Sequence, residues 1–272
     1  MKKLRFIVLS ACILALYLNL EHVQAAFSRN IMNVTVLSME EIETLCMGKD
    51  EVFSEPCITL RDAKIAYDRE QNMLLIPQSM QEENFQGWLS VPDGNLYFLE
   101  EAAFGDKAEA IANNQVFRLF WITDTQYWMY NVYFTGMPIL CLTTEAEENE
   151  KKSGTVWLYD QYRSRGSYPD MTCTWHVRGN TTRQYEKENY RLTLTEEKVS
   201  FLGMRQDDDW ILHGLYDDDG MIHNKVSYEV WKQIAGNNQV SNDEGLSMEY
   251  VELFKDGQYR GVYGLTERID KK

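Results

Sequence analysis

Apolar and polar residues alternate strictly in Thr174–Arg178 and again in Asn189–Thr195. A period of two residues is typical of a β-strand with one buried face. Between these segments, Gly179-Asn180 combines two residue types that tolerate positive φ, which predicts the turn of a β-hairpin. Lys187 has the parity of the open face of the second strand, so its ammonium group is expected to point away from the core if the strand begins that early.

The predicted hairpin is basic, because Arg178, Arg183, Lys187 and Arg191 all fall within it. Two explanations fit this pattern. A turn that contains glycine, with a lysine on the open face, is able to hold a phosphate group. Cations along a solvated edge hairpin also prevent strands of separate molecules from pairing. The spacing alone leaves both explanations open.

Upstream of the hairpin, short apolar segments recur at regular spacing and are separated by turn residues, which is typical of a β-sandwich. A short helix is expected at Met39–Met47, capped by Ser38, and a helix or helical turn at Asp106–Asn113. The charged run Glu145–Lys152 is expected to be a surface loop, and Arg163–Asp170 a linker. The expected strands are Asn33–Leu37, Asn72–Ile76, Gly87–Val91, Asn95–Leu99, Gln115–Ile122, Gln126–Phe134, Pro138–Leu142 and Thr155–Tyr159.

One convincing helix is expected downstream of the hairpin. Asp217–Asp219 offers N-capping carboxylates, and Gly236 suits the position after the helix end. Apolar residues recur through this helix at helical spacing and predict a face packed on the core, with a polar outer face opposite. The apolar residues are Ile222, Val226, Val230, Trp231 and Ile234, and the outer residues are Asn224, Lys225, Glu229 and Lys232.

The last strong pattern is a second hairpin. Glu249–Phe254 and Tyr259–Leu265 flank Lys255-Asp-Gly257. Asp-Gly suits a type I′ turn, because both central residues of that turn have positive φ.

The first residues indicate export. Met1–Arg5 is basic, Phe6–Leu20 is almost entirely apolar, and Val23-Gln-Ala25 resembles a signal-peptidase site. We expect residues 1–25 to be a secretory signal, the mature protein to be secreted or at the cell surface, and no stable membrane anchor to remain after cleavage. A lipoprotein box at Leu9-Ser-Ala-Cys12 is the alternative, although the apolar run continues well beyond it.

Composition narrows the class of partner. The chain has 272 residues, of which 44% are hydrophobic and 12% aromatic, so it can build a sizeable core. Its formal net charge is −15, which argues against nucleic acid as a partner, because phosphate contacts rely on a cationic surface. An anionic ligand must therefore meet a local basic cluster, and the hairpin is the clearest one.

Four cysteines remain after signal cleavage: Cys46, Cys57, Cys141 and Cys173. An even number in an exported protein allows two disulfides in three possible pairings, with Cys46–Cys57 the local choice. Four buried thiols are the alternative. No Cys-x-x-Cys is present, so a zinc site is not expected.

Several motifs in this order resemble the spore-coat protein H (CotH) family of atypical secreted protein kinases. The resemblance covers residues 171–272 and is weaker upstream. The motifs are Val177-Arg-Gly-Asn-Thr-Thr-Arg183 with Lys187, Leu202-Gly-Met204, Asp209-Trp-Ile-Leu212, Leu215-Tyr-Asp-Asp218, Ile222-His-Asn-Lys225, and Gly257 with Gly261-Val-Tyr-Gly-Leu-Thr-Glu267.

The strand spacing predicts a mostly-β, sandwich-like domain over 26–165, and the resemblance implies a kinase-like small lobe over 171–272 with an antiparallel sheet and one helix, so the expected fold class is α+β. The resemblance also implies that ATP and Mg²⁺ are used to phosphorylate hydroxyl groups of an extracellular or coat protein. The residues expected in the cofactor site are, from the resemblance, the turn Arg178, Gly179 and Asn180, the phosphate lysine Lys187, and Arg183 and Glu267. Glu229 is added as the steadying carboxylate because kinases in general need one on the helix. An ordinary pairing of Glu229 with Lys225 is the alternative for the carboxylate.

Two departures from the family pattern limit the expected activity. His223 stands where the family usually has arginine, so a bidentate anion contact is in doubt there. The sequence also stops five residues after Glu267, whereas kinases take the catalytic base and metal ligands from the lobe that follows. We therefore expect an incomplete kinase domain without its C-terminal lobe, with catalytic residues beyond 272 and little phosphoryl transfer. The acidic runs Asp207–Asp209 and Asp217–Asp219 are interpreted as a turn and a helix start, not as metal sites.

A different class of function stays open. Tryptophans and tyrosines in the β-rich region, such as Trp88 and Trp128, can serve as platforms for sugars, which would suit a non-catalytic exported module that binds a protein or glycan surface. Core packing explains most aromatics of a β-sandwich, so the binding module is the alternative to the kinase hypothesis. A secreted hydrolase is disfavoured, because no Gly-x-Ser-x-Gly or His-Glu-x-x-His is present.

Overall fold

The fold is taken from a computed structural model. It describes residues 30–61, 63–79, 85, 87–100, 107–148, 151–160, 167–236 and 245–268. The expected signal peptide at 1–25 lies outside the described residues. The described chain forms two compact units, Met1–Ile65 with Met80–Tyr133, and Ala66–Ser79 with Phe134–Lys272. None of the described helices is both long and apolar enough to cross a membrane.

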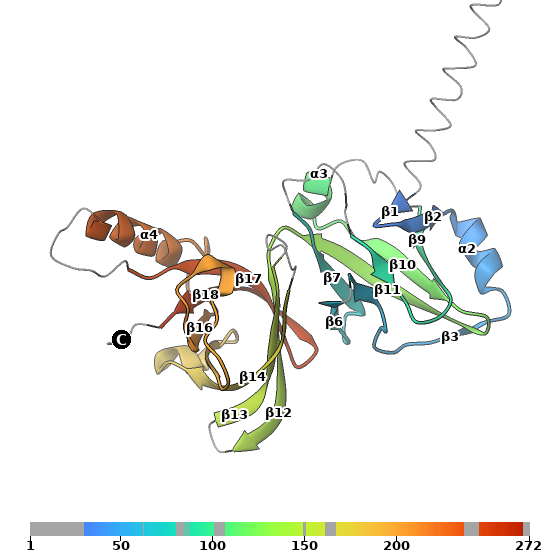
Figure 1. Ribbon diagram of the computed structural model, residues 1–272. Helices are drawn as coiled ribbons and strands as arrows, with labels where there is room; N and C mark the ends of the chain where they lie inside the picture. Colours follow the sequence, from blue (N-terminus) through green and yellow to red (C-terminus); the bar gives the residue numbers. More distant parts are fainter. Residues whose placement is uncertain are drawn as a thin grey trace, which may run out of the picture. The chain divides into compact units, whose positions relative to one another are not determined.

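The first unit is built on a β-sheet, as the regular strand spacing predicted (Figure 1). Its strands follow the order β1 (Asn30–Ile31), β2 (Val34–Leu37), β9 (Asn95–Leu99), β10 (Phe117–Ile122) and β11 (Gln126–Thr135), and β3 (Asp50–Glu51) pairs with β11. A smaller sheet contains β5 (Ala63–Lys64), β4 (Thr59–Leu60) and β8 (Leu89–Ser90). The mostly-β character of this region is confirmed.

Both short helices of the first unit are close to their expected positions. They are α2 (Met39–Cys46) and α3 (Lys107–Ala112). Ser38 caps α2 through a capping box with Glu41, in which each side chain bonds the other residue's backbone N–H. The stacked rings of Trp121 and Trp128, 4.1 Å between centroids, lie across the β10–β11 pair. Aromatic packing within the sheet therefore accounts for Trp128.

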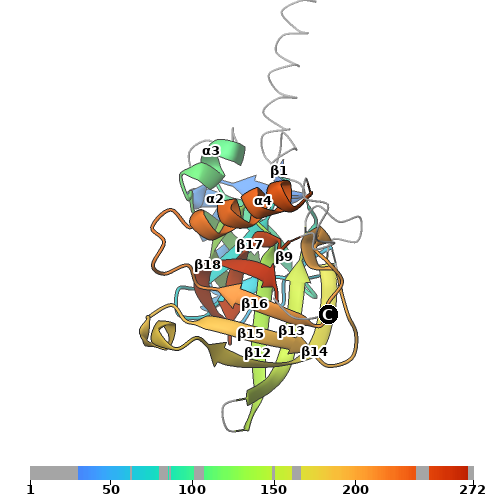
Figure 2. The ribbon, with the colours of Figure 1, turned by 90° about the vertical axis from the view of Figure 1, so that its left-hand side faces the viewer.

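The second unit contains a closed seven-stranded barrel (Figure 2). Its strands in order are β12 (Ile139–Glu148), β13 (Lys151–Tyr159), β14 (Ser167–Arg178), β15 (Asn189–Leu194), β16 (Asp209–His213), β18 (Gln258–Glu267) and β17 (Met248–Lys255). The hairpin of β6 (Ala66–Asp68) and β7 (Met73–Pro77) also belongs to this unit. Two short 3₁₀ helices, η1 (Thr181–Gln184) and η2 (Phe201–Gly203), complete it with helix α4 (His223–Gly236).

The barrel differs from the expected antiparallel sheet in how it closes. Strand β12 pairs in parallel with β17, with Ile139 opposite Glu252 and Leu142 opposite Lys255. Strands β12 and β13 were assigned to the first region from sequence, yet they form the wall that closes the barrel. The charged run Glu145–Lys152 was expected to be a loop, and its described residues instead extend these two strands. Alternation shows which face of a strand is buried, but it does not show which distant strand is its neighbour.

The barrel interior is filled by large side chains from the alternating positions. Trp175, Trp210 and Tyr263 are each at most 1% exposed, and Tyr190 packs edge-on against Trp175. Interior and exterior residues alternate along each strand of a barrel. Because the inward residues are fixed by core packing, the positions of the outward residues that alternate with them are fixed as well.

The first predicted hairpin is confirmed in its strands and differs in its turn. His176 lies opposite Arg191, as antiparallel pairing of the two alternating segments requires. The connection is longer than a two-residue turn and contains η1. Gly179 has a φ of 109°, and a Cβ there would lie 1.9 Å from the Thr182 hydroxyl oxygen, so a side chain is excluded. The second predicted hairpin has the expected Asp-Gly turn, with positive φ at Asp256 and Gly257.

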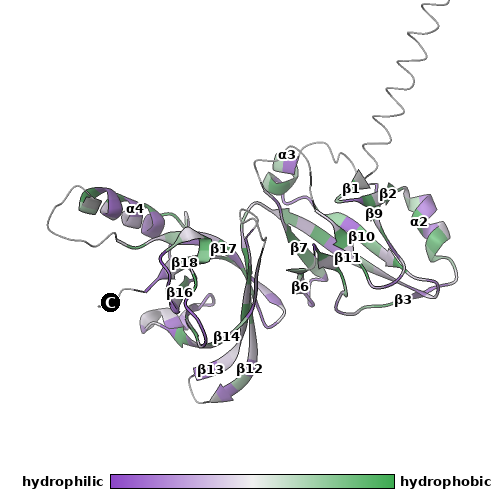
Figure 3. Cartoon of the chain, viewed as in Figure 1, coloured by the Kyte–Doolittle hydropathy of each residue, from purple (hydrophilic) through white to green (hydrophobic). Residues whose placement is uncertain are grey.

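Helix α4 has the opposite orientation to the one that its apolar pattern predicted. The stripe expected to face the core is exposed, and Figure 3 shows apolar and polar residues mixed along the helix. Lysines hold the other face: Lys225 donates to the Met248 carbonyl, and Lys232 donates to the Ser247 hydroxyl. Hydrogen bonds along β17, and not apolar burial, therefore position α4. The exposed residues are Ile222, Val226, Val230, Trp231 and Ile234.

We expect Val226→Lys to change the free energy of unfolding by less than about 0.5 kcal/mol, because Val226 is 53% exposed and a lysine there meets solvent. Urea unfolding of both proteins measures this. Leu212→Lys, inside the barrel at 0% exposure, is the contrasting change and is expected to prevent folding. A loss above about 2 kcal/mol for Val226→Lys would instead show that the stripe is buried in solution.

None of the four cysteines in the described part of the chain forms a disulfide. Cys141 and Cys173 are buried in the barrel, and burial raises the pKa of Cys173 to about 12. The local Cys46–Cys57 disulfide is not formed. Cys57 is exposed and Cys46 is half-buried, so only two of the four thiols are buried.

Candidate functional site

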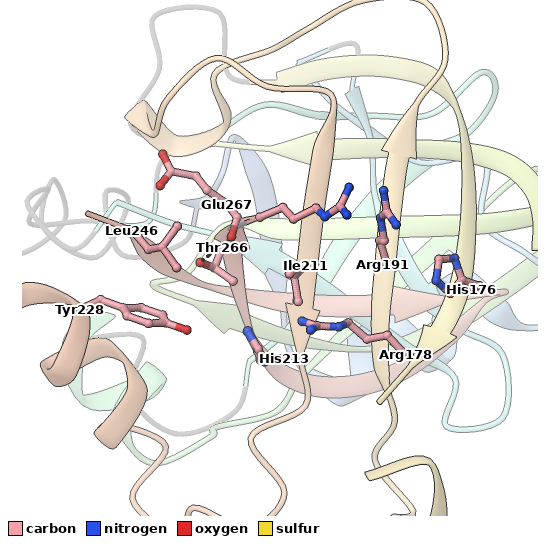
Figure 4. Close-up of a pocket in the computed structure, with 10 residues that line it drawn as sticks. His176, Arg178, Arg191, Ile211, His213, Tyr228, Leu246, Thr266 and Glu267 are labelled. Carbon is pink, nitrogen blue, oxygen red and sulfur yellow. Dashed lines mark hydrogen bonds between the residues drawn. The ribbon is translucent and has the colours of Figure 1, made fainter. Parts of the chain in front are cut away.

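A pocket of about 340 Å³ lies on the outer face of the barrel wall, next to α4 (Figure 4). We call it the arginine pocket. Four neighbouring strands supply its floor, because His176, Arg191, Ile211 and Thr266 lie opposite one another in register and point outward. The remaining lining residues are Arg178, His213, Tyr228, Leu246, Glu267 and Arg268. The sheet, the helix and the end of β18 together position this group.

One carboxylate holds two of the three arginines. Arg191 Nη2 lies 3.0 Å from both carboxylate oxygens of Asp209, and Arg268 Nη1 lies 2.9 Å from Oδ2. Thr193 donates a further hydrogen bond of 2.6 Å. Burial raises the pKa of the Asp209 carboxyl, but the hydrogen bonds from Thr193, Arg191 and Arg268 outweigh burial and the pKa is lowered. Asp209 is therefore ionised at neutral pH and balances one of these two positive charges.

The third arginine is not balanced. No acceptor among the described residues bonds the Arg178 guanidinium. Burial lowers the pKa of Arg178, and the nearby charges of Arg191 and Arg268 lower it further. A guanidinium stays charged in proteins even so, and a half-buried charge among like charges costs free energy unless an anion meets it. The pocket is thus prepared for a negatively charged ligand.

His213 and Tyr228 add polar groups beside Arg178. Burial lowers the pKa of His213 to about 4, with a further contribution from the charge of Arg178. The imidazole is therefore neutral at pH 7 and is able to donate one hydrogen bond and accept another. Burial raises the pKa of Tyr228, so its hydroxyl stays protonated. Together they give the arginine pocket uncharged donors next to its cations.

The structure brings together two of the residues implied for the cofactor site. Arg178 and Glu267 both line the arginine pocket. The Glu267 carboxylate, however, is 3% exposed and is occupied by backbone N–H groups of Arg205, at 2.7 Å, and Ser247, at 3.0 Å. Its contacts join the end of β18 to the segments before β16 and β17. Glu267 therefore has a structural role: it holds the segments around the pocket in place.

The other implied residues lie apart. Lys187 lines a second pocket at one end of the barrel, where its Nζ donates to the Val262 carbonyl. Glu229 is on the exposed part of α4, 3.8 Å from Lys232 Nζ, and the two residues Lys187 and Glu229 form no ion pair. The alternative pairing of Glu229 with Lys225 is also not formed, because Lys225 binds Glu249 at 3.0 Å.

The connection after β14 holds the remaining three residues. Gly179 and Asn180 start it, and the Arg183 guanidinium donates to the Val177 carbonyl at 3.1 Å. Thr182 Oγ1 is buried without a hydrogen-bond partner in the described structure. At the start of α4, the Asp218 carboxylate accepts the His223 backbone N–H at 2.9 Å, which confirms a capping role for one of the expected aspartates.

Sequence reasoning missed Arg191, His213 and Arg268 as pocket residues. Arg191 was detectable, since it follows the parity of Arg178 across the hairpin. Lys187 was chosen from the family resemblance, and its place on the open face of the strand depended on an early strand start, whereas β15 begins at Asn189. His213 and Arg268 carry no local signal, because their neighbours in the pocket come from other strands.

These observations define a mostly-β protein whose barrel carries a pocket lined by three arginines. Residues 175–272 match the family model described as CotH kinase protein, which covers most of the barrel and all of α4. Over this segment the chain is similar to the CotH family, and the resemblance seen in the sequence motifs is confirmed there. No curated protein matches the chain. In the described residues no three histidines, cysteines or acidic residues are grouped to hold a metal ion.

Proposed function

We propose that residues 134–268 form the nucleotide-binding small lobe of an exported CotH-like protein kinase, and that the arginine pocket holds the phosphates of ATP. The observation that carries the proposal is the unbalanced guanidinium of Arg178 next to Arg191 and Arg268. The proposed acceptor is a hydroxyl group of an extracellular or coat protein.

The chemistry of the pocket fits a polyphosphate. Guanidinium groups bind phosphate oxygens in pairs of parallel hydrogen bonds, and three of them oppose the charge that phosphoryl transfer must neutralise. Arg178 offers all its side-chain donors, whereas Arg191 and Arg268 share theirs with Asp209. Tyr228 from α4 supplies a hydroxyl at the rim.

Magnesium enters this proposal with the nucleotide. ATP carries Mg²⁺ on its phosphates in kinases, where the ion neutralises developing charge. The described residues that line the pocket are mainly donors, so they fit the phosphate oxygens and not the metal. Their contribution is to bind and orient the phosphates.

Equilibrium titration with a fluorescent ATP analogue in the presence of Mg²⁺ tests the proposal. Arg178→Ala is expected to lower the affinity by about tenfold or more, since a charge-assisted hydrogen bond contributes about 1.5–3 kcal/mol. Lys198→Ala, which removes a half-exposed lysine that pairs with Asp208 at 3.4 Å, is the matched control and is expected to bind normally.

Lys187→Ala distinguishes the arginine pocket from the site first implied by the family resemblance. Because Lys187 lines a different pocket, its loss is expected to leave ATP affinity unchanged. Loss of affinity in Lys187→Ala with normal binding in Arg178→Ala would move the phosphates to Lys187 and refute the pocket assignment. Equal affinity in all four proteins would refute both.

A further inference from the structure

The barrel has a second site at the end where β14, β15, β17 and β18 meet their connections. We call it the barrel mouth and define it by Lys187, Lys255, Trp175, Tyr190 and Tyr263. Four of these residues line a pocket of about 340 Å³, and Trp175 contacts two of the four. The mouth lies on the inner side of the barrel wall. On β15 the side chain of Tyr190 points inward, whereas Arg191 points outward into the arginine pocket.

The lysines of the mouth retain donors for a ligand. Lys187 Nζ donates to the Val262 carbonyl and lies 4.7 Å from the centre of the Tyr263 ring. No carboxylate pairs with it in the described structure, and two of its three N–H groups have no bonded acceptor. Burial lowers the pKa of Lys187, partly offset by the charge of Glu252. Lys255 Nζ pairs with Asp256 at 2.8 Å.

A buried donor lies beside these lysines. The Trp175 side chain is 1% exposed, and its Nε1–H has no acceptor among the described residues. A buried donor without an acceptor costs about 1–3 kcal/mol, so such groups are rare in folded proteins. Lys255 Nζ lies 4.8 Å from the centre of the same indole. The indole therefore lies beside a cation that lines the pocket, and its N–H signal is a sensitive reporter of a ligand there.

Aromatic faces surround the cations. Tyr190 and Tyr263 stack with 6.0 Å between ring centroids, and Tyr216 and Tyr259 line the outer part of the pocket. Tyr190 and Tyr263 are 3% and 1% exposed, so the rings open to a flat apolar group are those of Tyr216 and Tyr259. Glu186, Glu188 and Arg260 also line the pocket, so its three cations face two carboxylates and leave a formal excess of one positive charge, which suits a ligand with a single negative charge.

We propose that the barrel mouth binds a small molecule with one anionic head group, a carboxylate or a phosphate monoester, on a flat apolar body. Lys187 and Lys255 hold the head group, and the tyrosines hold the body. This site takes a different ligand from the arginine pocket and does not depend on nucleotide binding there.

The test uses the full chain labelled with ¹⁵N, with phenyl phosphate and phenylacetate as probes. The indole N–H signal of Trp175, assigned from its loss in Trp175→Phe, is expected to shift and saturate with at least one probe. The tighter probe identifies the head group. Benzyl alcohol lacks the charge, and inorganic phosphate lacks the flat body, so both are expected to bind at least about tenfold more weakly. Failure of both anionic probes to saturate, or equal binding of benzyl alcohol or inorganic phosphate, would overturn the proposal.

Variants locate the binding. Lys187→Met keeps the apolar stem and is expected to weaken the tighter probe by about tenfold, and Lys255→Gln provides an independent change if Lys187→Met does not fold. Lys151→Gln changes an exposed lysine of β13 and is the matched control. Arg178→Ala is expected to leave the probe affinity unchanged while it lowers ATP affinity. Probe binding that is lost in Arg178→Ala and normal in both lysine variants would assign it to the arginine pocket and refute the proposal.

Discussion

Replacing Asp209 with alanine is expected to lower the free energy of unfolding by about 3 kcal/mol, because it leaves Arg191 and Arg268 without the carboxylate that joins them. Asp209 is 7% exposed and accepts from Thr193 as well as from both arginines. The arginine side chains are 30% and 38% exposed, so water recovers part of the cost. Urea unfolding at pH 7 measures the change.

Asp208 supplies the control for this prediction. It is the preceding residue, and its side chain pairs at 3.4 Å with Lys198, which is half-exposed. Asp208→Ala is therefore expected to cost less than about 1 kcal/mol. Equal losses in the two variants would show that the Asp209 network contributes no more than a surface ion pair.

The Asp209→Ala substitution is also expected to alter ligand binding in the arginine pocket. Without Asp209, Arg191 and Arg268 are free to turn their donors toward a ligand, so the affinity for inorganic phosphate is expected to rise. Asp209 therefore stabilises the barrel and at the same time reduces the positive charge that a phosphate meets. Stability and ligand affinity oppose each other at this residue, as is common where charged groups converge on a binding site.

Local pattern was sufficient to predict most of the strands and both hairpins. Trp175 and Val177 face the core as their alternation required, and Asp256-Gly257 forms the expected turn. Outside the alternating segments, the positions of side chains were not predictable from the sequence. The connection from Gly179 to Glu188 contains a 3₁₀ turn and β15 begins at Asn189, so the condition for placing Lys187 on the open face of the strand is not met.

The pairing of distant strands and the orientation of α4 could not be predicted from the local spacing of apolar residues. The parallel pairing of β12 with β17 joins residues more than a hundred positions apart, and no residue in either strand specifies it alone. The apolar spacing of α4 indicated a buried stripe, but Lys225 and Lys232 bond the β17 side instead. The site depended on both features, since Tyr228 reaches the arginine pocket because of that orientation.

One strand thus separates two basic sites of different character. Arg191 on the outer side of β15 belongs to a pocket with three guanidinium groups, suited to several phosphates. Tyr190 on the inner side belongs to a pocket with two lysines, one arginine, two glutamates and tyrosine rings, suited to one anionic group. The strict alternation that first marked this segment in the sequence is the reason that the two sites are distinct.

Acid is expected to destabilise the protein through His213. Its pKa is lowered to about 4 by burial and by Arg178, so the unfolded chain takes up the proton first as the pH falls below about 6.5. The folded state keeps its full contribution above that pH and loses about 3 kcal/mol by pH 4, since one pKa unit corresponds to about 1.4 kcal/mol. Asp209 has a lowered pKa and contributes its own loss in more acidic solution.

Urea unfolding of wild type and His213→Asn between pH 7 and pH 4 measures this dependence. The variant does not titrate at this position, so the difference between the two proteins is expected to change by about 3 kcal/mol over the interval. Tyr228 from α4 and Thr266 from β18 also line the pocket around His213, and neither changes charge in this range. Arg178→Ala removes one cause of the lowered pKa of His213. The pKa of His213 in the folded state is therefore expected to rise, and less stability is lost by pH 4. Parallel pH profiles for wild type and His213→Asn would contradict the buried, neutral imidazole on which the polarity of the arginine pocket depends.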